Sequence, residues 1–175
     1  MSSSDQITWT GTFTPTASTT DLANTCDVGT GYLDDAGNSG GAGQSANYKV
    51  DTVAPTVSSI TFADTALKAG ETSLVTIVFS EAVAGFANGD LSIAQGTMTA
   101  VSDSGDSITW TSTFTPTADV EDDANVLSIA SSYTDTLGNS GGVGSSANYE
   151  VETLLPTLTI GITSNNADVT KAKSG

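Results

Sequence analysis

The sequence repeats itself with a period of 101 residues. A stretch that begins Asp-Gln-Ile-Thr-Trp-Thr at Asp5 returns as Asp-Ser-Ile-Thr-Trp-Thr at Asp106, and both copies continue to a Phe-Thr-Pro-Thr motif. Residues 5–56 align with residues 106–157 without a gap, and about 30 of the 52 positions are identical. A fixed period is the signature of a repeat array, and about 100 residues is the size of one small β-sandwich.

The phase of the repeat predicts how the 175 residues divide into units. Residues 1–50 correspond to the C-terminal half of a unit, residues 51–153 to one complete unit, and residues 154–175 to the start of a third. A domain of about 100 residues can fold alone, whereas an isolated half-sandwich has open edges and little core. We therefore expect a slice of a longer array, or a chain whose ends pair with other molecules by strand addition.

The pattern of apolar residues predicts an all-β fold. Apolar and polar residues alternate with period two, and turn signals recur every 8–12 residues, which is typical of a β-sandwich. About seven strands are expected in the complete unit, and their order along the chain resembles that of an immunoglobulin-like Greek-key sandwich. Gly96 and Thr97 are expected to form a turn. The strands of the complete unit are expected at 56–62, 74–80, 90–94, 98–102, 107–115, 125–133 and 147–151.

Both tryptophans are expected in the core rather than on a sugar-stacking surface. Trp110 alternates in phase with Phe114, and Trp9 occupies the same place in the first unit. The single cysteine, Cys26, aligns with Leu127 and excludes an internal disulfide. It is therefore expected to act as a small buried apolar group rather than as a reactive thiol.

The charge of the chain excludes some partners and favours others. Twenty acids face four lysines, with no arginine or histidine, for a formal net charge of −16. This balance argues against nucleic acid and anionic membranes as partners and favours cations. It also suggests an extracellular setting, where salt or bound cations reduce self-repulsion; a merely soluble acidic surface is the alternative. No apolar run approaches the ~18 residues of a membrane span, so membrane insertion is not expected.

The residue inventory does not suggest an enzyme. Without histidine, arginine or a second cysteine, neither a Ser-His-Asp nor a Cys-His arrangement can be assembled. The glycine-rich runs at 37–43 and 138–144 lack the Lys-Ser/Thr of a phosphate loop. No sequence feature singles out a buried pair of carboxylates whose two pKa values would differ, as in glycosidases.

Carboxylates and amides are expected to gather where consecutive units meet. If the first strand of a unit runs away from the incoming linker, the second strand returns toward it. The loops near 81–90 and 134–146 then lie at the same end, or pole, of the sandwich as the linker. The residues expected there are Asp51, Glu81, Asp90, Asp135 and Asn139, with Asp34 and Asn38 as the counterparts of the last two in the first unit. At the opposite pole, the acids of the loop near 119–123, among them Asp122 and Asp123, lie beside Glu152.

This ligand set predicts a hard cation. Carboxylates, carbonyls and amides without nitrogen or sulfur ligands suit Ca²⁺ more than Mg²⁺ when the geometry is loose. The sequence from Asp135 to Asn139 lacks the alternating acids of an EF-hand loop. The alternative is that these Asp and Asn residues are ordinary turn formers.

Four motifs, in order over one period, resemble the bacterial immunoglobulin-like repeats of giant secreted surface adhesins. They are Asp-Thr-Val-Ala-Pro-Thr from Asp51, Val-Phe-Ser-Glu-Ala-Val-Ala-Gly-Phe from Val78, Phe-Thr-Pro-Thr from Phe114 and Tyr-Thr-Asp-Thr-Leu-Gly-Asn from Tyr133. The resemblance implies a cell-surface stalk of tandem sandwiches, often stiffened by calcium, that serves attachment or biofilm formation.

Two functions are therefore expected for the chain. The first is a structural extender whose partners are the neighbouring repeats. The alternative is a binding module whose exposed loops, such as 140–146, contact glycan or protein. The second linker begins with Glu152 where the first has Asp51, so equivalent metal ligands are less certain there.

Overall fold

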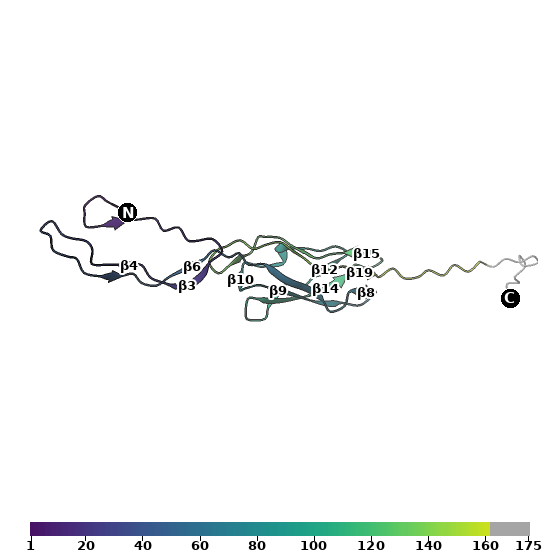
Figure 1. Ribbon diagram of the computed structural model, residues 1–175. Coiled ribbons are helices and arrows are strands. Elements are labelled where there is room, and N and C mark those ends of the chain that lie inside the picture. Colours follow the sequence, from purple (N-terminus) through teal and green to yellow (C-terminus); the bar gives the residue numbers. More distant parts are fainter. Residues whose placement is uncertain (162–175) are drawn as a thin grey trace, which may run out of the picture.

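The computed structural model describes residues 1–161 and shows an elongated chain of β-strands (Figure 1). The only helical element among these residues is a single 3₁₀ turn, Asn88–Asp90. The strands of the first unit are β1 (Ser2–Ser3), β2 (Trp9–Thr10), β3 (Thr20–Asn24), β4 (Asp27–Val28), β5 (Gly43–Gln44) and β6 (Tyr48–Asp51).

The strands from residue 57 to residue 152 form a sandwich, which confirms the expected immunoglobulin-like fold class. They are β7 (Val57–Phe62), β8 (Ala66–Lys68), β9 (Ser73–Phe79), β10 (Val83–Ala84), β11 (Leu91–Ser92), β12 (Gly96–Met98), β13 (Ser102–Asp103), β14 (Thr109–Pro116), β15 (Glu121–Asn125), β16 (Ser128–Ile129), β17 (Thr134–Asp135), β18 (Gly144–Ser145) and β19 (Tyr149–Glu152).

One layer of the sandwich is the sheet β12-β14-β9-β7, with β13 paired to β14. The strands that complete the fold pair as β15-β19-β8, β11-β16-β18 and β10-β17. Alternation along β9 buries Val75, Ile77 and Phe79 completely or nearly so. These side chains meet a second set that includes Leu127 and Tyr133, both fully buried, and the two sets form one hydrophobic cluster.

The strand expected at 125–133 is the main error in the predicted element bounds. The chain instead forms β15 and then β16, so Asp122 and Asp123 lie on a strand and not in a loop. Between Asp122 and Asn125 the pairing with β19 shifts register. The buried Asn125 amide there donates to the backbone oxygens of Asp122 and Tyr149, at 3.0 and 3.3 Å. The Asn125 side chain thus takes the place of backbone hydrogen bonds between β15 and β19. Sequence periodicity alone cannot predict this replacement.

Two further details differ from the sequence-based expectations. Gly96 lies in β12 rather than in a turn, and a Cβ at this position would come within 2.3 Å of the Phe114 ring, so only glycine fits. β8 was not expected, because its three residues are too short to show a period; it pairs in parallel with β19 and buries Leu67 completely.

The repeated Asp-x-Ile-Thr motif is a turn that begins a core strand. The Oδ1 atom of Asp106 accepts the N–H groups of Thr109 and Ile108, at 2.8 and 2.9 Å. These bonds stabilise the ionised form and lower the pKa of Asp106 to about 2. Asp5 accepts the corresponding N–H groups of Thr8 and Ile7 in the first unit.

The first unit reproduces the local pairings of the complete unit but leaves its apolar face uncovered. β3 pairs with β6, with Thr20 opposite Asp51, as β15 pairs with β19, with Glu121 opposite Glu152. Counterparts of β7, β9 and β12 are not among the described residues.

The uncovered face overturns two expectations for the first unit. Trp110 is partly buried against the core and packs edge-on to Phe86, with ring centroids 5.4 Å apart. In contrast, Trp9 is 60% exposed and Cys26 is exposed, so burial of these two side chains was a wrong prediction. Leu127, the counterpart of Cys26, is fully buried because its face is covered.

Truncating the two equivalent phenylalanines should have very different effects. Phe114→Ala removes a fully buried ring, and we expect it to lower the free energy of unfolding of the complete unit by about 3–5 kcal/mol. Phe13→Ala removes a ring that is 63% exposed and should change that free energy by less than about 0.5 kcal/mol. Urea titrations of the two variants measure this difference, and equal losses would contradict it.

Candidate metal centre at the junction between units

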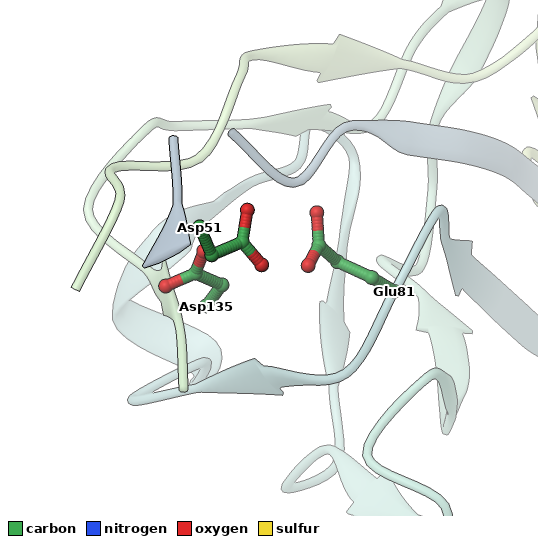
Figure 2. Close-up of side chains that lie close together, drawn as sticks. All are labelled: Asp51, Glu81 and Asp135. Atoms are coloured by element: carbon green, nitrogen blue, oxygen red, sulfur yellow. The ribbon is translucent and has the colours of Figure 1, made fainter. Parts of the chain in front are cut away.

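Three carboxylates meet at the pole of the complete unit that faces the first unit (Figure 2). Asp51 ends β6, a strand of the first unit that runs one residue past the expected bound at residue 50, whereas Glu81 lies between β9 and β10 and Asp135 ends β17. Because β10 pairs with β17, with Val83 opposite Asp135, the loop that carries Glu81 is held beside Asp135. One carboxylate oxygen from each of the three acids lies within 4.8 Å of the others. We call these residues the junction triad.

Asp135 is the anchored member of the junction triad. Its Oδ1 atom accepts the N–H groups of Leu137 and Asn139, at 2.8 and 2.9 Å, and its Oδ2 atom accepts the Asn139 side-chain amide. Burial acts to raise the pKa of this carboxyl, but the bonds from Asn139, Leu137 and Gly138 outweigh burial and lower it. Asp135 is therefore an ionised acceptor although only 3% of the residue is exposed.

Asn139 also connects the two units. Its Nδ2 atom donates to the backbone oxygen of Asp51 at 3.1 Å, and Gly142 N–H donates to the backbone oxygen of Pro55 at 2.9 Å. Both contacts hold the linker between the units against the loop that follows Asp135. The sequence predicted a place for Asn139 at this pole, and the structure puts it beside both Asp51 and Asp135.

Thr52 fixes the other side of the linker. Its Oγ1 atom accepts the N–H of Thr19 and donates to the backbone oxygen of Thr16, both at 2.9 Å. Thr153, one period later, makes the same pair of bonds to Val120 and Thr117. Sequence reasoning missed this clamp, although the identity of the two threonines in the repeat was a signal for it.

Negative charge in the junction triad is not balanced by any lysine in the described part of the chain. The one ion pair among the described residues joins Lys68 to Glu71, at 3.0 Å. Burial raises the pKa of Glu81, and the charges of Asp51 and Asp135 raise it further. Two unit charges 4 Å apart repel by about 4 kcal/mol at an effective dielectric constant of 20. Close approach of the three acids therefore disfavours the folded junction when no cation is bound.

The structure places Asp90 outside the junction triad. Its Oδ2 atom accepts the N–H of Ala87 at 2.8 Å, and its Oδ1 atom bonds the Ser132 hydroxyl. This carboxylate thus closes the 3₁₀ turn and ties it to the segment after β16. Its role in the structure is that of a turn residue.

Asp34 and Asn38 repeat the local geometry of Asp135 and Asn139. Asp34 accepts the N–H of Asn38 at 2.8 Å and its side-chain amide at 2.8 Å. The side chain of Asn38 makes the largest contribution to a lowered pKa of Asp34. Asp34 is exposed, however, and no described group of three acids includes it. Asp34 therefore repeats the local turn of Asp135, whereas the counterparts of Asp51 and Glu81 that would lie beside it are not among the described residues.

The acids expected at the opposite pole do not form such a group among the described residues. Asp122 accepts the side-chain amide of Gln95 at 2.8 Å, and the backbone oxygen of Asp123 accepts the Asn148 amide at 2.9 Å. Glu152 lies opposite Glu121 across the β15–β19 pair.

Comparison with known proteins gives one match. A family model described as a bacterial Ig-like domain matches residues 1–50 and again residues 51–151. No curated protein and no solved structure matches the chain. Within residues 1–161, the structure has no helix long and apolar enough to cross a membrane.

Neutralising one acid of the junction triad should stabilise the protein when divalent cations are removed. Glu81→Gln keeps the shape of the side chain and removes its repulsion with Asp51 and Asp135, so we expect the melting temperature in chelator to rise by roughly a few degrees. Glu150→Gln, on the exposed face of β19, is the control and should leave it unchanged. A melting temperature that falls in Glu81→Gln would mean that the carboxylate is stabilising without a cation.

Proposed function

The chain belongs to the family of bacterial Ig-like domains, and we propose that it is an extender segment in the stalk of a bacterial cell-surface adhesin, stiffened by Ca²⁺ at the junction between units. The observation that carries this proposal is the junction triad. Its acids come from both sides of the linker, so one bound cation would join the two units directly.

The donor set suits calcium. Ca²⁺ takes six to eight oxygen ligands in flexible geometry, whereas Mg²⁺ demands a near-ideal octahedron and keeps several waters. The junction offers the three carboxylates, and the backbone oxygen of Asp51 lies at the same place, where it accepts the Asn139 amide. No nitrogen or sulfur ligand is present in this group, which argues against a transition metal.

Stiffening follows from where the ligands lie. Thr52 holds the linker to the first unit, and Asn139 and Gly142 hold it to the second. Ca²⁺ at the junction triad would add a strong electrostatic link at the same place and remove the repulsion. With ~10 mM Ca²⁺ and a site of ~0.1 mM affinity, binding would add about 2.7 kcal/mol of stability.

The biological setting is part of the same proposal. Domains of this family are typically structural modules without enzymatic activity. A net charge of −16 requires screening or bound cations, which the extracellular medium supplies. We place the chain at the bacterial surface, secreted, with neighbouring repeats as its partners and with attachment or biofilm formation as the process that it serves.

A calcium series of thermal melts tests the metal site. The complete unit should melt on the order of 10 °C higher in Ca²⁺ than in chelator, and Mg²⁺ should not reproduce this rise. Asp135→Asn should abolish the rise. Asp34→Asn is the matched control, because Asp34 has the same hydrogen bonds but lies outside the junction triad, and it should leave the rise intact.

Small-angle scattering tests stiffening separately from stability. The particle should be longer and less variable in Ca²⁺ than in chelator, and Asp135→Asn should remove the difference. If the scattering profiles in Ca²⁺ and chelator are equal while Ca²⁺ still raises the melting temperature, the extender role is contradicted and the metal site has only a local effect. Equal melts in calcium, magnesium and chelator would contradict the site itself.

A ligand-binding module is the second candidate, because the loop expected to bind ligands lines a groove. Val143, Gly144 and Ser145 form one wall of an open groove of about 560 Å³, and Leu91 and Ile129 contribute to its apolar lining. Val143 is 77% exposed there.

A glycan array distinguishes the two functions. An extender should bind no glycan, whereas a module acting through this groove should give a reproducible signal that Val143→Asp removes. A signal that persists in Val143→Asp would exclude the groove as its origin.

A further inference from the structure

One sheet of the complete unit presents an outer face without charge. The strands β7, β9, β12 and β14 contain no Asp, Glu, Lys or Arg, although the chain carries twenty acids. The short β13 adds Asp103, which lies opposite the inward Trp110 and therefore not on the outer side of the sheet. We call the outer side of this sheet the neutral face; its central members are Thr61, Leu74, Thr76, Val78, Ser102 and Thr111.

Hydroxyl side chains form a continuous row across the neutral face. Ser102 lies opposite Thr111, and Thr111 lies opposite Thr76. Thr76 in turn lies opposite Thr61, so the row crosses β13, β14, β9 and β7. Side chains directly opposite each other on neighbouring strands point to the same side of a sheet. The row is therefore a property of the assembled sheet, and no single strand carries it.

Methyl and larger apolar groups complete the neutral face. Leu74 and Val78 flank Thr76 on the same side of β9, and Leu74 is 51% exposed. All four outward positions of β14, from Thr109 to Thr115, are threonine. Each threonine supplies a methyl group and a hydroxyl that both donates and accepts. Such a face can contact another neutral surface without burying a charge.

The strands of the opposite layer carry the charge instead. Tyr149 of β19 packs from across the core on Phe62 and Phe114, with ring centroids 4.6 and 5.2 Å away. β19 and the strands paired with it, β15 and β8, hold five acids and one lysine: Glu121, Asp122, Asp123, Glu150, Glu152 and Lys68.

This separation of charge decides how two copies of the chain can approach. Stacked sheets lie about 10 Å apart, so two units packed through their neutral faces keep their acidic layers about 30 Å apart. That distance is well beyond the Debye length of about 8 Å at physiological ionic strength. Contact through the acidic layers would bring the same acids to about 10 Å. Of the two sheet faces, the neutral face is the one through which chains of net charge −16 repel least.

We propose that the neutral face binds the neutral face of a second copy of the chain, so that two such segments associate side by side. The contact is isologous, because the same row lies on both partners, and identical hydroxyl rows can hydrogen-bond to each other. The outward positions of β7, β9 and β14 carry no aromatic ring on which a sugar could stack and no charge that could bind an ion. The proposal is independent of the calcium site.

The area of the face predicts a weak contact. β7, β9 and β14 have six, seven and eight residues. Four strands about 4.8 Å apart, each about seven residues long at 3.3 Å per residue, cover roughly 450 Å². Two faces then bury about 900 Å², which lies in the range of transient complexes. We expect a dissociation constant of about 0.1–1 mM.

Sedimentation equilibrium of the full chain in chelator measures this association. The average mass should rise with protein concentration toward that of a dimer. Association should strengthen severalfold when NaCl is raised from about 0.05 to about 0.5 M, because salt screens the remaining repulsion between the copies. Association that weakens over this range would be held by charged groups and would contradict the proposal.

A charge swap at the centre of the row shows whether the neutral face is responsible. Thr76→Lys and Thr76→Asp should each weaken association at least tenfold, because like charges then face each other. An equimolar mixture of the two variants should associate again, since a lysine of one copy then faces an aspartate of the other. Recovery in the mixture excludes loss of the fold as the cause. Phe13→Asp, which changes an exposed ring of the first unit, is the control and should associate like the unchanged chain.

Three results would overturn the proposal. The first is a chain that stays monomeric at about 1 mM in high salt. The second is a mixture of the two Thr76 variants that associates no better than either variant alone. The third is association that Phe13→Asp abolishes and Thr76→Lys leaves intact, which would assign the contact to the first unit.

Discussion

The structure depends on the burial of two half-repeats against each other. Neither half has a core alone: β9 contributes Val75, Ile77 and Phe79, and these side chains are buried only because Tyr133 and its neighbours lie over them. The first unit is the internal comparison. It repeats the strand registers of β15 with β19 and of β16 with β18, yet Trp9, Phe13 and Tyr32 are more than half exposed. Local sequence therefore sets the pairing within each half, and packing between halves sets burial.

The same dependence explains where charge can be placed. In a β-sandwich the apolar side chains of each strand point inward, and the loops lie at the two poles. Acids are excluded from the core and therefore accumulate at the poles. Linker and loops then bring Asp51 of one unit within 4.8 Å of Glu81 and Asp135 of the next. The linker is hydrogen-bonded on both sides, so the backbone of Asp51 is held beside the loop that carries Asp135.

The period and the alternation were sufficient to predict the fold class and the inward orientation of Trp110 and Phe114 in the complete unit. The sequence also predicted that one pole would hold Asp51, Glu81, Asp135 and Asn139, because the placement of loops follows from the order of the strands. It placed Asp90 there as well, since nothing local distinguishes a pole carboxylate from one that closes a 3₁₀ turn. The shifted register at Asn125 and the parallel pairing of β8 depend on contacts distant in the chain, which a local pattern cannot encode.

The two linkers share a threonine clamp but differ in one backbone hydrogen bond that follows it. After Asp51, the short carboxylate accepts the N–H of Val53 at 3.0 Å, so the chain turns back on its own side chain. After Glu152 the side chain is one methylene longer, and the equivalent N–H, that of Leu154, donates instead to the backbone oxygen of Val120 at 3.0 Å. The threonine clamp is the same in both places, so each last strand ends alike. What differs is the acceptor of the N–H two residues after the acid, which is the carboxylate of Asp51 in the first linker and the backbone oxygen of Val120 in the second. The first linker therefore closes a turn on its own carboxylate that the second linker does not close, although both acids carry the same charge.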